Sequence, residues 1–163
     1  MKANTVGKMN AEVRRAYLAG FIDGDGCIMA TIERHSEKRF GFRVRVEVKI
    51  TQKDSQLLKN LAREFNMGQV SCNRRDTDHA TYDWIIRDKE DVKTILEYIR
   101  PYSRLKQEQI CIDLEILEKV IVTKKDLLRN ARLADSLSRL NVRSKNRRKI
   151  LATMVKAFIS PND

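Results

Sequence analysis

The stretch that most constrains the fold covers residues 16–32, AYLAGFIDGDGCIMATI. Residues 16–22 are apolar on every side, which predicts a helix that is buried all round. The helix then runs into DGDG, in which Asp23 and Asp25 alternate with glycines that should end it. The C-terminal end of a helix carries partial negative charge, so a carboxylate there is unfavourable unless a cation compensates for it. The sequence therefore predicts a buried helix whose acidic end requires a cation.

Three small residues recur four positions apart along this helix: Ala16, Gly20 and Gly24. Positions four apart share one helix face, where small side chains let another backbone approach closely. If two identical helices pack along this stripe, two Asp25 side chains meet near a two-fold axis. The stripe therefore predicts a homodimer with Ala16, Gly20 and Gly24 in its interface.

Two Asp25 carboxylates at such an axis would repel each other. One of them would take up a proton unless cations bound between them. Carboxylate oxygens suit Mg²⁺ or Ca²⁺. Divalent ions that bridge the attacking and leaving oxygens are a recurrent device for phosphodiester cleavage. Two symmetric sites of this kind, one for each strand, would break a DNA duplex.

The charge of the chain points to a polyanionic partner. Lys and Arg number 33 against 22 Asp and Glu, which gives a formal charge of +11. DNA, RNA or an anionic membrane surface would fit, and a merely solvated basic surface is the alternative. No apolar run approaches the roughly 20 residues of a membrane span, which disfavours the membrane. The scattered cysteines and the lack of a secretory signal favour an intracellular protein, in a prokaryotic cytoplasm or an organelle.

Hydrophobic periodicity predicts an α+β fold. Residues 42–50 alternate between apolar and charged side chains, which is typical of an antiparallel strand with one buried face. Similar but shorter patterns and N-cap residues complete the order αββαββα, with four strands sharing one exposed polar face. The expected helices cover residues 11–22, 54–65 and 89–99, and the expected strands cover residues 27–33, 42–50, 70–75 and 81–86.

Further helices follow this core. We expect a long helix over residues 105–122, a second from a Thr123 cap to about residue 140, and a last one from a Ser144 cap to residue 158. We expect the whole chain, 1–163, to form one domain, with a loose N-terminus (1–9), a core (11–117) and C-terminal helices (123–158). The run 139–149 is basic without any acidic residue. It is either solvated surface or a phosphate-binding segment that uses Arg143, Lys145, Arg147 and Arg148.

The polar strand faces predict a DNA-reading surface. An eight-residue strand spans roughly 26 Å, and a two-stranded ribbon fits the major groove. At roughly 3.4 Å per base pair, the ribbon could follow about seven or eight base pairs. An ordinary solvated strand face is the alternative. The side chains expected to contact DNA are Met29, Thr31, Glu33, His35, Arg43, Arg45, Glu47, Lys49, Ser71, Asn73, Arg75, Thr81 and Asp83.

Residues 18–26, LAGFIDGDG, resemble the nine-residue motif of the LAGLIDADG homing endonucleases. They depart from it at Phe21 and Gly24, and the resemblance extends over residues 11–117 in the order of elements. A single motif resembles the homodimeric branch, with its saddle-like DNA-binding sheet. The resemblance implies a site-specific endonuclease that breaks both strands at a long pseudo-palindromic site and promotes intron homing. It also implies Mg²⁺ dependence, with Mn²⁺ as a substitute and Ca²⁺ binding without supporting cleavage.

The resemblance further implies three catalytic residues. Asp25 would ligate the metal, assisted by the Gly24 carbonyl. Gln52, in a matching ITQK segment, would lie near the metal-bound water. Lys106, in a matching RLKQ segment, would stabilise charge on the phosphate.

The resemblance leaves the roles of two positions unassigned. The basic residue expected four positions after Gln52 is Gln56 here, which leaves Lys53 or Arg104 as substitutes. Asp23 is expected to support the helix end or the partner chain rather than the metal.

Non-enzymatic functions are the alternatives. An RNA maturase or a DNA-binding regulator could use the same scaffold without cleaving. Gln52 and Lys106 could then be ordinary polar residues of the surface. A structural RNA-binding protein would explain the charge but not the acidic helix end. Retention of all three catalytic residues favours the endonuclease.

Overall fold

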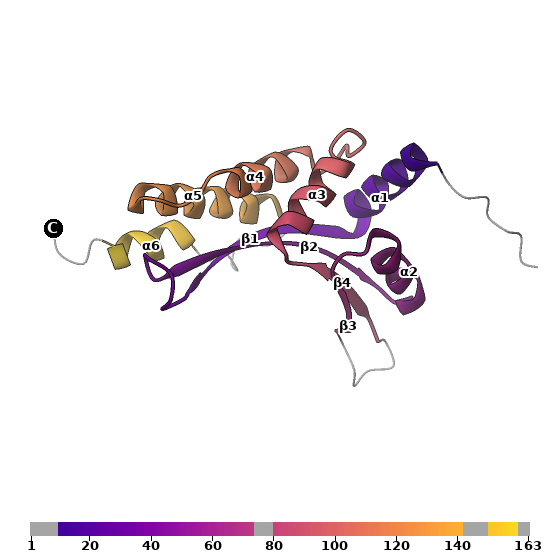
Figure 1. Cartoon of the computed structure of the whole chain (residues 1–163), viewed down its shortest axis with the longest axis horizontal. Coiled ribbons are helices and arrows are strands. Elements are labelled where there is room, and N and C mark those ends of the chain that lie inside the picture. Colours follow the sequence, from indigo (N-terminus) through magenta and orange to yellow (C-terminus); the bar gives the residue numbers. More distant parts are fainter. Residues whose placement is uncertain (1–9, 74–79, 142–149, 160–163) are drawn as a thin grey trace, which may run out of the picture.

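The computed structural model describes residues 10–73, 80–141 and 150–159. A four-stranded antiparallel sheet curves beneath a layer of helices (Figure 1). The predicted α+β class and the order αββαββα are confirmed. The described elements are α1 (Ala11–Asp25), β1 (Gly26–Arg34), β2 (Phe42–Gln52), α2 (Ser55–Phe65), β3 (Gln69–Cys72), β4 (Tyr82–Ile86), α3 (Lys89–Ile99), α4 (Gln107–Glu118), α5 (Lys124–Asn141) and α6 (Leu151–Ile159).

The strand order in the sheet is β1-β2-β4-β3. β1 pairs along its whole length with residues 42–50 of β2, from Gly26 opposite Ile50 to Arg34 opposite Phe42. β4 pairs only with residues 48–52 of β2, and β3 lies outside β4. The β1–β2 hairpin therefore extends well beyond the other two strands.

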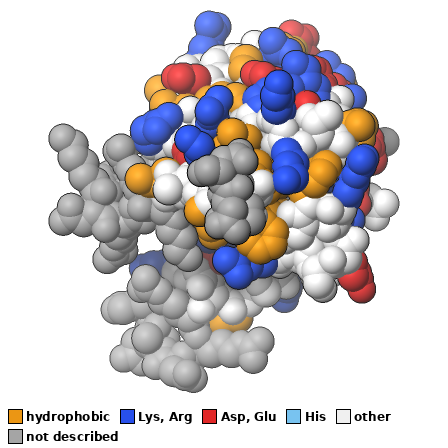
Figure 2. Space-filling view, turned by 90° about the vertical axis from the view of Figure 1, so that its left-hand side faces the viewer, with side chains coloured by type: hydrophobic (Ala, Val, Ile, Leu, Met, Phe, Trp, Pro, Cys, Tyr) orange, Lys and Arg blue, Asp and Glu red, His pale blue; other side chains and the backbone are white. Residues whose placement is uncertain are grey.

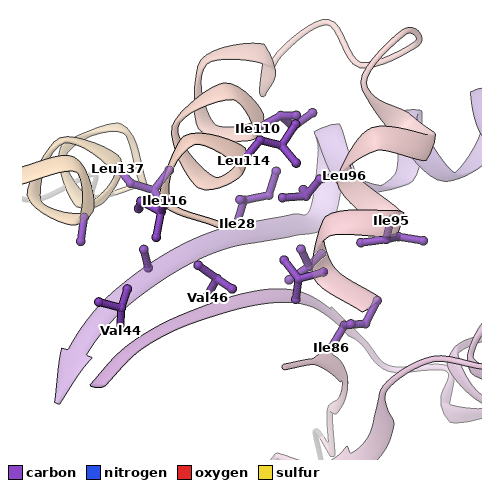
Figure 3. Packing of buried hydrophobic residues seen from close by; sticks show 14 of the residues in the cluster. Ile28, Val44, Val46, Ile86, Ile95, Leu96, Ile110, Leu114, Ile116 and Leu137 are labelled. Carbon is purple, nitrogen blue, oxygen red and sulfur yellow. The ribbon is translucent and has the colours of Figure 1, made fainter. Parts of the chain in front are cut away.

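The core lies between the apolar face of this sheet and the helices above it. Val44, Val46 and Ile28 from the strands meet Ile116 and Leu114 of α4 (Figure 3). Alternation along β2 decides which side chains enter this core: its even-numbered residues from 42 to 50 are at most 6% exposed. The period-two pattern thus buries one face and leaves the other face polar.

Four predicted helix caps are confirmed. The side chains of Asn10, Asp54 and Asp88 accept hydrogen bonds from the first backbone N–H groups of α1, α2 and α3. At α5, Thr123 Oγ1 accepts from the Asp126 N–H while Asp126 Oδ2 accepts from the Thr123 N–H. Such reciprocal bonds satisfy backbone donors that have no partner within the helix.

The ends of two helices differ from the prediction. α1 continues through Gly24 to Asp25, and only Gly26 caps it, by donating its N–H to the Ile22 carbonyl. α4 spans only Gln107–Glu118, shorter than the predicted 105–122. Before its start, the N–H groups of Arg104 and Leu105 donate to the Asp23 carboxylate.

The last helix begins later than the predicted Ser144 cap. α6 begins at Leu151, after a non-helical Ile150, and Ser144 lies outside the described residues. The first N–H groups of α6, those of Leu151 and Ala152, donate to the Asp135 carboxylate at 2.7 and 2.9 Å. A residue of α5 therefore caps α6, because helix packing brings a buried carboxylate to the helix start.

Replacing Asp135 by Ala should lower the free energy of unfolding by about 1–2 kcal/mol, because it leaves one buried and one partly buried backbone donor without an acceptor. Urea denaturation measures this change. Glu115→Ala, on the exposed face of α4, is the matched control and should change stability by less than about 0.5 kcal/mol. Equal losses in the two variants would contradict the capping role.

The prediction that α1 is buried on every side is wrong for one chain. Leu18, Ala19 and Ile22 are fully buried, whereas Ala16 and Gly20 are exposed. The reason is that α3 and the sheet cover only one face of the helix. None of the described helices is long and apolar enough to cross a membrane, and the expected intracellular location stays a prediction.

Candidate active site

The C-terminal end of α1 places Asp25 at the start of the sheet. Gly26 caps the helix and begins β1 directly. A Cβ at Gly26 would lie 2.7 Å from the Ile22 carbonyl oxygen, so this tight junction requires glycine. The last turn of α1 holds no basic residue. The exposed Asp25 carboxylate therefore lies at the negative end of the helix dipole.

Lys106 brings a cation to this helix end from a distant part of the chain. Its Nζ donates to the Asp23 carbonyl oxygen at 3.0 Å. This carbonyl belongs to the last turn of α1, where carbonyl groups have no partner within the helix. The cation that the acidic helix end requires is thus supplied in part by the segment that precedes α4.

Gln52 completes the convergence. It is the last residue of β2, and its Nε2 donates to Asp25 Oδ2 at 2.6 Å. The three residues predicted to be catalytic therefore converge on the C-terminal end of α1, although they come from a helix, a strand and a loop. At the position where the resemblance implies a basic residue, Gln56 donates to Asn60 along α2. Lys53 and Arg104, the two possible substitutes, are both exposed.

Asp23 has a role that the sequence left open. Its carboxylate accepts hydrogen bonds from Ser103 Oγ at 2.5 Å and from the N–H groups of Arg104 and Leu105 at 2.6 and 3.1 Å. Burial by itself raises the pKa of Asp23, but these hydrogen bonds outweigh it and hold the pKa below its ordinary value. Asp23 therefore fixes the loop of its own chain that carries Lys106.

The residues at this helix end fit a hard divalent cation. The Asp25 carboxylate and the backbone of Gly24 are exposed side by side, and oxygen donors of this kind suit Mg²⁺. Within the described ranges, no three His, Cys, Asp or Glu side chains cluster around a possible metal position. The carboxylate that is left to bind a metal here is that of Asp25, because the Asp23 carboxylate is engaged by Ser103 and two backbone N–H groups.

Around this site, one side of α1 is apolar and uncovered. A Cβ at Gly20 or Gly24 would meet nothing within 4 Å, so the fold of a single chain does not require glycine at either position. Tyr17 is 45% exposed, and Leu105, in the Asp23-bound loop, is 74% exposed. The sequence analysis did not single out Leu105, because it placed this residue at the start of a helix.

The polar face of the sheet carries the predicted DNA-contacting side chains. Met29, Thr31 and Glu33 of β1 lie opposite Glu47, Arg45 and Arg43 of β2. Glu33 contacts the guanidinium groups of Arg43 and Arg45 at 2.9 and 3.0 Å. Carboxylates thus hold these arginines in place across the sheet.

A second polar cluster surrounds Asp83 on β4. Asp83 accepts from Thr51 Oγ1 at 2.6 Å and from Asn73 Nδ2 at 3.3 Å, and Lys49 Nζ lies 3.8 Å from its other oxygen. Asp83 lies on the polar face of the sheet, as predicted, but the residue is only 6% exposed. Its neighbours cover it, so it organises this cluster instead of presenting its own carboxylate.

The remaining residues predicted to contact DNA lie at the margins of this polar face or outside the described residues. Ser71 is exposed on β3, Thr81 is half-buried next to β4, and the ring of His35 lies at the hairpin turn, partly buried. Arg87, which donates to Glu47 at 2.6 Å, was missed, although the β4 alternation extended by one step would have included it. Five predicted contacts lie outside the described residues: Arg75, Arg143, Lys145, Arg147 and Arg148.

Comparison with known proteins supports the motif-based assignment. The family model described as LAGLIDADG endonuclease matches residues 18–121. The chain is 32% identical over 106 residues to DNA endonuclease I-CreI of Chlamydomonas reinhardtii, a match that spans 64% of this chain and 62% of that relative. It is 30% identical over 149 residues to DNA endonuclease I-CvuI of Chlorella vulgaris, across 89% of each protein.

Solved structures agree with these relatives. The homing endonuclease I-CvuI, in complex with its target in the presence of Ca²⁺, matches with a TM-score of 0.79 at 30% identity. The match covers 93% of this chain and 95% of that chain. The same enzyme bound to the I-CreI target in the presence of Mg²⁺, with the DNA not cleaved, gives a TM-score of 0.80.

Proposed function

The chain belongs to the LAGLIDADG endonuclease family, and from this premise we propose that it is a site-specific DNA endonuclease. We propose further that it acts as a homodimer, requires a divalent metal ion and promotes intron homing. The convergence of Asp25, Gln52 and Lys106 at the end of α1 carries the proposal. A protein that only bound nucleic acid would have no need of an exposed carboxylate at the negative end of a helix.

Each residue of this site has a distinct task. Asp25 and the Gly24 carbonyl would hold Mg²⁺, which neutralises charge on the phosphate when bound. Gln52 holds one oxygen of Asp25 and thereby orients the other. Lys106 keeps a positive charge next to the place where the scissile phosphate must lie. Asp23 restrains the loop that carries Lys106, so it is a positioning residue.

Dimerisation supplies the second half of the site. The uncovered face of α1 carries Ala16, Gly20 and Gly24, where a second α1 can approach closely. Two chains related by a two-fold axis would bring two Asp25 carboxylates together, and two metal-dependent sites would cut both strands. The two sheets would extend to either side of this axis, each along the major groove, and read a long pseudo-palindromic site.

A selection from random DNA tests this function without knowledge of the target. The full chain is incubated with a pool of randomised duplexes and Mg²⁺, and the cleaved ends are sequenced. We expect cuts in both strands within one pseudo-palindromic consensus. Mn²⁺ should replace Mg²⁺, and Ca²⁺ should support binding without cleavage. EDTA should abolish cleavage because it removes the metal ion that would neutralise charge on the phosphate.

The same selection separates the alternatives. Specific binding without cleavage in Mg²⁺ and Mn²⁺ would identify a DNA-binding regulator, and preference for structured RNA over every duplex would indicate a maturase. Cleavage that persists in EDTA would contradict metal dependence. Sedimentation of the DNA complex with a single bound chain would contradict the homodimer.

A further inference from the structure

The edge of β2 that faces away from β1 is covered over only half its length. β4 pairs with residues 48–52, and the chain then turns at Arg87 into α3. On the side away from β1, residues 42–47 have no neighbouring strand among the described residues, and this side is here called the open β2 edge. A strand edge without a partner exposes backbone donors and acceptors that can pair with another chain.

The register shows which backbone groups point outward. The His35 N–H donates to the Gly41 carbonyl at 2.8 Å, which continues the β1–β2 ladder. Alternate residues of an antiparallel strand bond to opposite sides, so odd-numbered residues of β2 bond to β1. The N–H and C=O groups of Phe42, Val44 and Val46 are therefore directed to the open β2 edge.

Two grooves run along this edge. The first, of about 380 Å³, lies on the core side and is lined by apolar residues that include Phe40, Leu117 and Val120. The second, of about 310 Å³, lies between β2 and the turn at Arg87. Val120 is 80% exposed and the nearby Val122 is 55% exposed, so apolar side chains lie open to solvent at the first groove. The edge thus combines free ladder groups with apolar surface.

The charges around the grooves are positive. Lys38, Lys89 and Lys119 line them, and none of these has an ion-pair partner within the described parts of the chain. Of the described lining residues only Asp88 is acidic, and its carboxylate is engaged by the N–H groups of Glu90 and Asp91. Figure 2 views the molecule from this end, where hydrophobic side chains lie exposed between Lys and Arg side chains.

We propose that the open β2 edge is a docking site for an extended acidic and apolar segment of a partner protein. Six residues in strand conformation span roughly 20 Å. Such a segment would add a strand in line with β4, place alternate apolar side chains in the first groove and direct its carboxylates to the three lysines.

Two other occupants fit less well. A nucleic acid could contact the basic second groove, but it would meet the apolar wall of the first groove and could not use the ladder groups. A second copy of this chain would bring the same lysines against each other at the same edge, and like charges repel.

A synthetic peptide of alternating Glu and Val tests the proposal with the full chain. We expect saturable binding by fluorescence anisotropy, together with slower hydrogen exchange at the amides of Phe42, Val44 and Val46. A Lys and Val peptide should not bind, and an acidic peptide N-methylated at alternate residues should bind at least about tenfold more weakly, because it cannot complete the ladder.

Protein variants make the test specific. The combined change Lys89→Glu and Lys119→Glu, or Val120→Glu alone, should weaken peptide binding roughly tenfold or more. Lys59→Glu, on the exposed side of α2, is the matched control and should bind as the unchanged chain does. No saturable binding of the acidic peptide, equal binding of the basic peptide, exchange protection elsewhere, or equal effects of all three changes would each overturn the proposal.

Discussion

Asp25→Asn abolishes DNA cleavage while DNA binding is retained, if the proposed site is correct. The variant keeps the shape of the side chain, and its amide oxygen can still accept from Gln52 Nε2. It loses the charge that would hold the metal ion. Because a bound metal contributes several kcal/mol to charge stabilisation, the cleavage rate should fall by roughly a thousandfold or more. Cleavage assays on the selected target, with parallel gel-shift titrations, measure both properties.

Glu115→Gln is the matched control for this substitution. It also converts an exposed carboxylate to an amide, on α4, away from the site, and should leave cleavage unchanged. Undiminished cleavage by Asp25→Asn would remove Asp25 from the mechanism. Loss of DNA binding along with cleavage would indicate that Asp25 has a structural role instead.

Mixing the wild-type protein with the Asp25→Asn variant tests whether two chains share one catalytic unit. If double-strand cleavage needs Asp25 from both chains, equal amounts of wild type and Asp25→Asn, allowed to exchange, should retain about one quarter of the activity. Independent chains would retain about one half. The mixture therefore distinguishes the shared site from two separate ones, whatever the absolute rate.

Asp113→Leu is expected to stabilise the protein strongly, and more so as the pH rises. Asp113 lies on α4 with no exposed surface, and neither carboxylate oxygen has a hydrogen-bond partner among the described residues. Burial raises the pKa of Asp113 to about 8. The folded protein therefore keeps a proton that the unfolded chain releases near pH 4, so stability falls as the pH rises between these two values.

The size of this effect follows from proton linkage. Between about pH 4 and pH 8 the wild type should lose at most roughly 1.4 kcal/mol of stability per pH unit relative to Asp113→Leu. Below this window both states bind the proton, and above it both release it, so the difference levels off at each end. Urea denaturation at a series of pH values within this window measures it.

Asp113→Asn serves as the second variant. It cannot ionise, so its stability should run parallel to that of Asp113→Leu across the pH range. It should nevertheless be the less stable of the two, because a buried amide without a partner costs about 1–3 kcal/mol. If wild type and Asp113→Leu showed parallel pH profiles, Asp113 would not carry a buried proton.

Much of the fold was predictable because its signals are local. The alternation in β2 lies within one segment of eleven residues. The caps Asn10, Asp54, Asp88 and Thr123 all bond to backbone groups only two or three positions away. Interactions of such short range depend little on the rest of the chain, so a single sequence is enough to find them.

Two long-range interactions explain where prediction failed. Asp135 caps a helix that begins 16 residues later, and no local pattern marks that partner. Asp23 accepts from the N–H groups of Arg104 and Leu105, 81 and 82 residues away, and so fixes the loop that precedes α4. Both carboxylates find their donors only after the helices have packed, because only packing brings these segments together.

At the acidic end of α1, the sequence by itself determined the family, the carboxylate and its need for a cation. The need follows from the helix dipole, which any helix ending in Asp25 would create. Only the tertiary structure decided that Lys106 supplies a cation there, that Asp23 fixes its loop and that Gln52 orients Asp25. It also decided that β4 stops halfway along β2. Strand pairing and loop placement depend on contacts between distant segments, which only the folded chain brings together.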